Sequence, residues 1–155
     1  MSDLIVYVFD DQNGSVALKD ALVSFRKAKD FPVFDAAVVK RAPDGGSSMY
    51  EASSLAGSGR WGGPFWGMLI GLVFWAQWLD LSIGAALNDL DLDDEFVKQV
   101  GEALGKDQSA LLLVVPSGTA YTYQPVLQNF MARVIKASIS EAAESRLNTI
   151  FIKEA

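Results

Sequence analysis

The chain has 155 residues, of which 50% are hydrophobic and 21% charged, and its formal net charge is −6. This acidic balance disfavours nucleic acid and anionic lipid as partners, because it offers no extended basic surface for phosphates. The absence of Cys and His excludes thiolate nucleophiles, histidine-based triads, disulfides and zinc sites with nitrogen or sulfur ligands. We therefore predict one domain over residues 1–155 that is not an enzyme and needs no cofactor or metal.

The first part of the chain predicts a strand, a helix and two further strands. Residues 4–9 are a short apolar run typical of a buried strand, and the preceding Asp3 is acidic where a secretory signal would be basic, so we expect a cytoplasmic protein. Residues 14–29 place apolar side chains at three- and four-residue spacing, as in an amphipathic helix. Residues 34–40 and 48–52 predict two strands joined by a turn at Pro43-Asp44-Gly45-Gly46.

The last part predicts two more strands among three helices. Residues 93–105 form the first helix, with Asp93 as its N-cap and an acidic first turn. A wholly apolar strand follows at 110–116, then a helix at 123–135, a short strand at 136–139 and a final helix from residue 140. This order predicts an α+β fold with a ferredoxin-like βαββαβ sheet, extended by C-terminal α-β-α elements.

Residues 57–88 form an inserted glycine-rich apolar helical segment that differs from the rest of the chain. No charged residue lies between Arg60 and Asp80, and all four tryptophans fall in this interval. Gly63, Gly67 and Gly71 are four residues apart and share one side of a helix, which we call the glycine face. A helix surface without side chains allows the backbone of another helix to approach closely.

This segment has two interpretations, a membrane contact or a buried contact between copies of the chain. As a helix, residues 61–79 would span about 28 Å, close to the thickness of the hydrocarbon core of a bilayer. A single crossing would separate the first three strands from the strand at 110–116, and residues 82–87 are too short for a return crossing. We therefore favour a homo-oligomer held by a glycine zipper, with peripheral or re-entrant association at the inner face of the cell membrane as the alternative.

The predicted interface combines the glycine face with the large apolar side chains around it, which need cover from water. Its residues are Gly63, Gly67, Gly71, Phe65, Trp66, Leu69, Leu72, Phe74 and Trp75.

Two glycine-rich or acidic motifs suggest ligands but have simpler explanations. Gly57-Ser58-Gly59-Arg60-Trp61-Gly62 matches the G-x-G-x-x-G pattern that binds pyrophosphate, but it follows the third predicted strand, whereas a dinucleotide fold has it after the first. Small-ligand or nucleotide binding is therefore a distant alternative to a glycine hinge. Residues 89–95 offer carboxylates with part of the spacing of a calcium loop, although Asp94 stands where that loop requires glycine.

Two further sets of polar side chains follow predicted strands. Asp10 and Asp11 could form an acidic site, or a turn and helix cap ahead of Gly14. Tyr121 and Tyr123 could stack on a ligand or a partner, although exposed tyrosines are common on protein surfaces.

Three motifs resemble an uncharacterised bacterial family, the domain of unknown function 1269 family. They are Phe9-Asp10-Asp11, the glycine-aromatic run at residues 62–72, and Leu92-Asp93-Asp94-Glu95-Phe96. The resemblance implies an apolar segment for which members are labelled predicted membrane proteins, and it implies no catalytic residues. In the family a second glycine- and alanine-rich limb usually follows, and here it is reduced to residues 82–87.

Overall fold

The computed structural model describes residues 1–74 and 94–151. Its elements are β1 (Ser2–Phe9), α1 (Gly14–Ala28), β2 (Asp35–Arg41), β3 (Ser47–Glu51), α2 (Ser53–Ala56), α3 (Gly62–Phe74), α6 (Asp94–Ala103), β4 (Ser109–Pro116), α7 (Ala120–Leu127), β5 (Arg133–Ile139) and α8 (Glu141–Phe151).

The strands form one sheet in the order β3-β2-β4-β1-β5, and every neighbouring pair is antiparallel. Strands β1 and β4, which contain the apolar runs at residues 4–9 and 110–116, lie in the interior of the sheet and pair with each other from Ser2↔Pro116 to Phe9↔Ser109. Each is buried along almost its whole length, as a central strand covered on both faces must be. The α+β class predicted from the sequence is confirmed.

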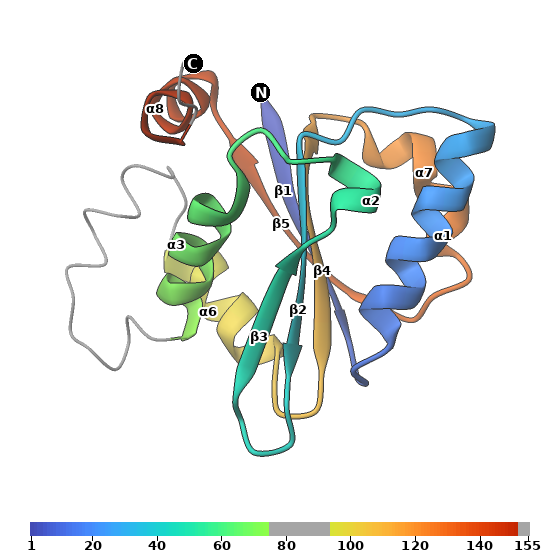
Figure 1. Cartoon of the computed structure of the whole chain (residues 1–155), viewed down its shortest axis with the longest axis vertical. Coiled ribbons are helices and arrows are strands. Elements are labelled where there is room, and N and C mark those ends of the chain that lie inside the picture. Colours follow the sequence, from blue (N-terminus) through green and yellow to red (C-terminus); the bar gives the residue numbers. More distant parts are fainter. Residues whose placement is uncertain (75–93, 152–155) are drawn as a thin grey trace.

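Helices cover both faces of the sheet, as Figure 1 shows, with α1, α2 and α7 on one side and α3, α6 and α8 on the other. Alternate residues of β1 point to opposite sides. Leu4, Val6 and Val8 pack toward α3, α6 and α8, whereas Ile5, Tyr7 and Phe9 pack toward α1, α2 and α7. The molecule thus has two hydrophobic cores that share one sheet.

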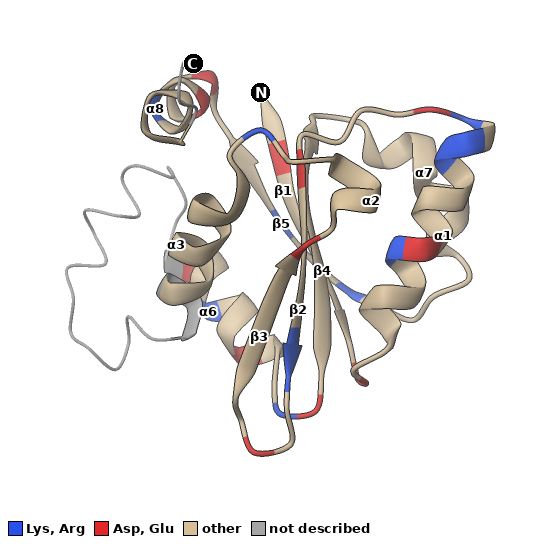
Figure 2. Ribbon diagram, viewed as in Figure 1, with Lys and Arg blue, Asp and Glu red and all other residues tan. Residues whose placement is uncertain are grey.

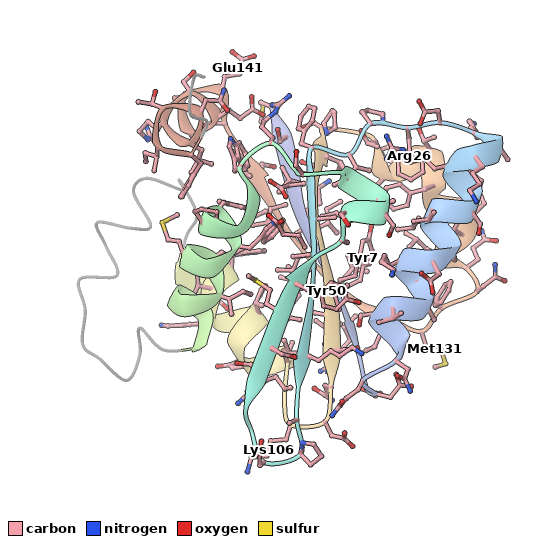
Figure 3. All side chains as sticks on the ribbon, viewed as in Figure 1. Tyr7, Arg26, Tyr50, Lys106, Met131 and Glu141 are labelled. Carbon is pink, nitrogen blue, oxygen red and sulfur yellow. The ribbon has the colours of Figure 1, made fainter. Side chains whose placement is uncertain are left out.

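A buried tyrosine pair lies in the core beneath α7. The hydroxyl oxygens of Tyr7 and Tyr123 are 2.7 Å apart and hydrogen-bonded, and their rings meet edge to face at 6.4 Å. Burial raises the pKa of Tyr7 to about 12, and burial also raises the pKa of Tyr123. Figure 3 places Tyr7 on the side of the sheet that faces α1. Tyr123 is therefore a core residue, while Tyr121 is 81% exposed.

The C-terminal boundaries differ from the prediction. The helix predicted at residues 123–135 is α7, which ends at Leu127, and the strand predicted at 136–139 is β5, which begins at Arg133. The prediction of helix across residues 128–135 was wrong because Arg133, Val134 and Ile135 pair with Val8, Tyr7 and Val6 of β1.

The strand order gives β3 a different place from the one predicted. The prediction put residues 48–52 among the four strands of a ferredoxin-like sheet. In the structure β3 lies at the sheet edge beyond β2, and the opposite edge is formed by β5. A tight turn after β2 holds β3 beside it, with the Ala42 amide donating to Gly46 and the Gly45 amide donating back to Ala42.

Candidate functional site

The N-terminal end of α3 is held by a buried carboxylate on the first residue of β2. Asp35 is 1% exposed. Its Oδ2 accepts hydrogen bonds from the backbone amides of Trp61 at 2.8 Å and Gly62 at 2.9 Å, and its Oδ1 accepts one from the Trp66 indole Nε1 at 2.8 Å. A negative charge is stabilised at a helix N-terminus, because the first amides have no partner within the helix and the helix dipole is positive there.

The glycine loop before α3 is shaped around this carboxylate. Gly57, Gly59 and Gly62 all have positive φ, between +63° and +76°, which L-residues with a side chain rarely adopt. A Cβ atom on Gly59 would collide with the Asp35 carboxylate. The G-x-G-x-x-G pattern therefore surrounds an anion that the chain itself supplies. The Trp61 and Gly62 amides, which a bound pyrophosphate would need, donate to Asp35 instead.

Aromatic contacts join the start of α3 to α8. The Trp61 indole donates from Nε1 to Asn148 Oδ1 at 2.8 Å, and the Phe65 ring lies 4.9 Å from the Trp61 ring and 5.9 Å from the Phe151 ring. The Arg60 guanidinium carbon lies 3.5 Å from the centre of the Phe34 ring, a cation–π contact just before β2. The first turn of α3 is thus bonded to both β2 and α8.

Three of the large side chains predicted to meet a partner, Phe65, Trp66 and Leu69, point into the chain's own core. Phe65 and Trp66 are fully buried and Leu69 is 1% exposed, and all three belong to the hydrophobic core that includes residues of β1, β2, β4, α6 and α8. Their need for cover is therefore met within one chain. Leu72 and Phe74 belong to the last turn of α3, and Trp75 lies outside the described residues, as do the rest of the predicted helix to residue 79 and the short limb at 82–87.

The glycine face lies mostly on the outer side of the same helix. Gly67 is exposed and Gly71 is half-buried, and among the described residues no heavy atom lies within 4 Å of the position that a Cβ atom would take on either. Gly63 is closer to the sheet edge, where a Cβ atom would lie 3.5 Å from Glu51 Oε1. The helix carries no charged residue, in contrast to α1, which carries both signs (Figure 2).

Within the described residues, the acidic side chains of Asp10 and Asp11 bond to nearby parts of the chain and form no common site. Asp11 Oδ1 accepts hydrogen bonds from the amides of Asn13 at 3.0 Å and Gly14 at 2.5 Å, which is a turn at the start of α1. Asp10 Oδ1 instead accepts a hydrogen bond from Gln108 Nε2 at 3.3 Å and forms an ion pair with Arg133 Nη2 at 3.6 Å. The predicted cap at Asp93, and all of the calcium-like motif before Asp94, lie outside the described residues.

Sequence reasoning missed Asp35 as a site residue. It stands at the start of a predicted strand, where a carboxylate usually faces solvent, and its partners are 26 to 31 residues away. The available signal was the combination of three glycines before an apolar helix with no acidic residue in its first turn. Such a helix start leaves amide donors that need acceptors from elsewhere.

Comparison with known protein families yields a match. The family described as "Protein of unknown function (DUF1269)" matches residues 61–152, which is more than half of the 155-residue chain and includes α3. No curated protein and no solved structure matches the chain. Across residues 1–74 and 94–151, none of the helices has both the length and the apolar character required to cross a bilayer. The glycine-aromatic run lies within the matched range, and the chain belongs to the DUF1269 family.

Proposed function

We propose that this protein is non-enzymatic and associates with copies of itself through the glycine face of α3, in the cytoplasm. The supporting observation is the outer side of α3, where Gly67 and Gly71 have no described atom within 4 Å of a Cβ position. A second helix could approach the backbone of α3 closely there, as helices with small residues at four-residue spacing do.

The composition of α3 supports an apolar contact at this face. None of its 13 residues has a charged side chain, and Met68 and Ile70, which flank the glycine face, are only half-buried. A helix with one face toward solvent ordinarily carries polar residues on that face, as α1 does with Asp20 and Lys27. The inner side of α3 is already used by the chain's own core, so the contact would use the outer side alone.

The test is the molar mass in detergent-free buffer, measured by light scattering on a sizing column. We expect an oligomer for the unmodified protein and a smaller species for Gly67→Leu, because the leucine side chain would separate the two helix backbones. Ala17→Leu places a leucine on an exposed position of α1 and is the matched control, which should leave the mass unchanged. A monomeric unmodified protein, or a Gly67→Leu protein of unchanged mass, would contradict the proposal.

The alternative is that the same outer side of α3 enters the interface of a membrane. The absence of charged side chains on α3 favours it, whereas the net charge of −6 opposes binding to anionic lipid. Flotation with vesicles of neutral phosphatidylcholine tests this alternative. Co-flotation that Gly67→Asp abolishes would support it, and recovery of the protein only in the lipid-free fraction would count against it.

We also propose that four of the strands form a ferredoxin-like unit to which β3 is added. The support is that α1 connects β1 and β2 across β4, and α7 connects β4 and β5 across β1, with both helices on one face. Amide hydrogen exchange tests it. Strands β2, β4, β1 and β5 should be protected as one cooperative unit and β3 should exchange sooner; equal protection of β3 and β4 would contradict it.

A further inference from the structure

A cavity of about 260 Å³ lies between α7 and the β1–β5 edge of the sheet. Its apolar walls include Ile5 on β1, Leu127 on α7 and Val134 on β5. The strand register places Lys136 opposite Ile5 and Val134 opposite Tyr7, so these side chains share the sheet face that α7 covers only in part. Val134 is 57% exposed, which places it at the open side of the cavity.

One end of this cavity holds a buried carboxylate whose side-chain contacts are long. Asp3, on the same face of β1, is 3% exposed. Its side-chain partners are Lys136 Nζ at 3.4 Å from Oδ2 and the Ser117 hydroxyl at 3.4 Å from Oδ1. Charge-assisted hydrogen bonds are normally about 2.7–2.9 Å long, and a buried carboxylate is costly unless it is well hydrogen-bonded. The site has room for a better donor.

The charges around the cavity favour a ligand with an ammonium group over a ligand with a carboxylate. The Lys136 side chain is 53% exposed, so its ammonium group can move into solvent, whereas the Asp3 side chain is 4% exposed and cannot. A ligand carboxylate would have to lie beside the buried Asp3 carboxylate, which like-charge repulsion opposes. A ligand ammonium would replace the long Lys136 contact by a short one.

We propose that this cavity binds a small amphiphilic primary amine, with the ammonium group on Asp3 and the apolar body against Ile5, Leu127 and Val134. The volume lies below the range typical of drug-sized ligands, which restricts the ligand to a short chain or a single ring. This site lies on the opposite face of the sheet from α3, and it is independent of the proposed self-association.

The experiment is a chemical-shift titration of the full chain with three probes of equal length, namely n-hexylamine, hexanoate and 1-hexanol. Hexylamine should saturate and shift the backbone amides of residues 3–7 and 134–136, with at least tenfold higher affinity than hexanoate. Hexylamine that shifts none of these amides, or hexanoate that binds as tightly, would overturn the proposal. Tight binding of 1-hexanol alone would also overturn it, because the cavity would then recognise only the apolar chain.

Variants assign the ammonium contact to Asp3. Asp3→Asn should weaken hexylamine at least tenfold and leave 1-hexanol unchanged, while Asp30→Asn, at a solvent-exposed carboxylate, is the matched control and should change neither. Lys136→Gln keeps the proposal testable if Asp3→Asn does not fold. It removes the competing ammonium and should tighten hexylamine binding several-fold; unchanged or weaker binding in Lys136→Gln would contradict the competition that the site implies.

Discussion

Helices α1 and α3, on opposite faces of the sheet, are held there by different means. On one face, α1 follows an ordinary amphipathic pattern, with Leu18 and Leu22 buried and charged residues outward. On the other, α3 has no charged side chain on any side, and its orientation is set by hydrogen bonds to Asp35 and by the rings of Phe65 and Trp66. In α3 the hydrogen bonds to Asp35, in place of a polar side, fix which side of the helix faces the core.

The largest expected effect comes from removing that anchor. Asp35→Ala leaves the Trp61 amide, the Gly62 amide and the Trp66 indole as buried donors without their acceptor. We expect the free energy of unfolding to fall by about 3–5 kcal/mol, since each unsatisfied donor costs roughly 1–3 kcal/mol and the costs do not add fully. Urea unfolding followed by tryptophan fluorescence and by circular dichroism measures this.

The matched control is Asp20→Ala on α1, whose carboxylate is 66% exposed and which should change stability by less than about 0.5 kcal/mol. If the two variants were equally stable, α3 would not depend on a polar anchor and would not differ from α1 in how it is held.

The next largest effect is a loss of stability at high pH that involves the Tyr7–Tyr123 pair, on the face of the sheet opposite α3. The pKa of Tyr7 is raised from 10.0 to about 12 in the folded state. Above pH 10 the unfolded chain therefore loses its phenolic proton first, which favours unfolding. The contribution of the protonated Tyr7 to the free energy of unfolding should be complete below pH 10. It should be lost as the pH rises toward 12, which lowers the free energy of unfolding by about 3 kcal/mol for Tyr7 alone.

Urea midpoints between pH 9 and pH 11.5 test this fall. Tyr7→Phe should show a shallower decline, because the Tyr123 contribution remains, whereas Tyr50→Phe, at an exposed tyrosine, should retain the full decline. A flat profile for the unmodified protein would show that the pair does not resist ionisation.

The smallest expected effect distinguishes two glycines of the loop before α3. Gly57 and Gly59 both have positive φ, but only at Gly59 would a Cβ collide with Asp35, while no atom in the described part of the chain lies within 4 Å at Gly57. Gly59→Ala should therefore cost about 1–3 kcal/mol more than Gly57→Ala, because it disturbs the buried carboxylate in addition to the backbone. Equal losses in thermal or urea unfolding would mean that backbone strain alone accounts for both.

The sequence predicted elements well where the pattern is local. The apolar runs at β1 and β4, and the three- and four-residue spacing in α1, needed no knowledge of distant residues. The boundary between α7 and β5 could not be read in the same way, since the pairing of Arg133 with Val8 decides it. The strand order also depends on long-range pairing, because β4 enters between β1 and β2.

The candidate site was only partly predictable for the same reason. The spacing of Gly63, Gly67 and Gly71 predicts one side of a helix from helical geometry alone, and all three residues lie within α3. The burial of Phe65, Trp66 and Leu69 within one chain depends on where the sheet and α8 lie. Asp35 was missed because a carboxylate at a strand start has no local feature that distinguishes a buried acceptor from a solvated one.

The two kinds of glycine around α3 also differ in what they imply for evolution within the DUF1269 family. At Gly59 the fold itself forbids a side chain, so selection for folding is enough to keep glycine there. At Gly67 and Gly71 the described residues leave room for a methyl group, and alanine is the better helix former by about 1 kcal/mol. Mutation should therefore replace these two glycines freely unless something beyond the described residues selects for them, and their retention among relatives would mark the helix surface on which that selection acts.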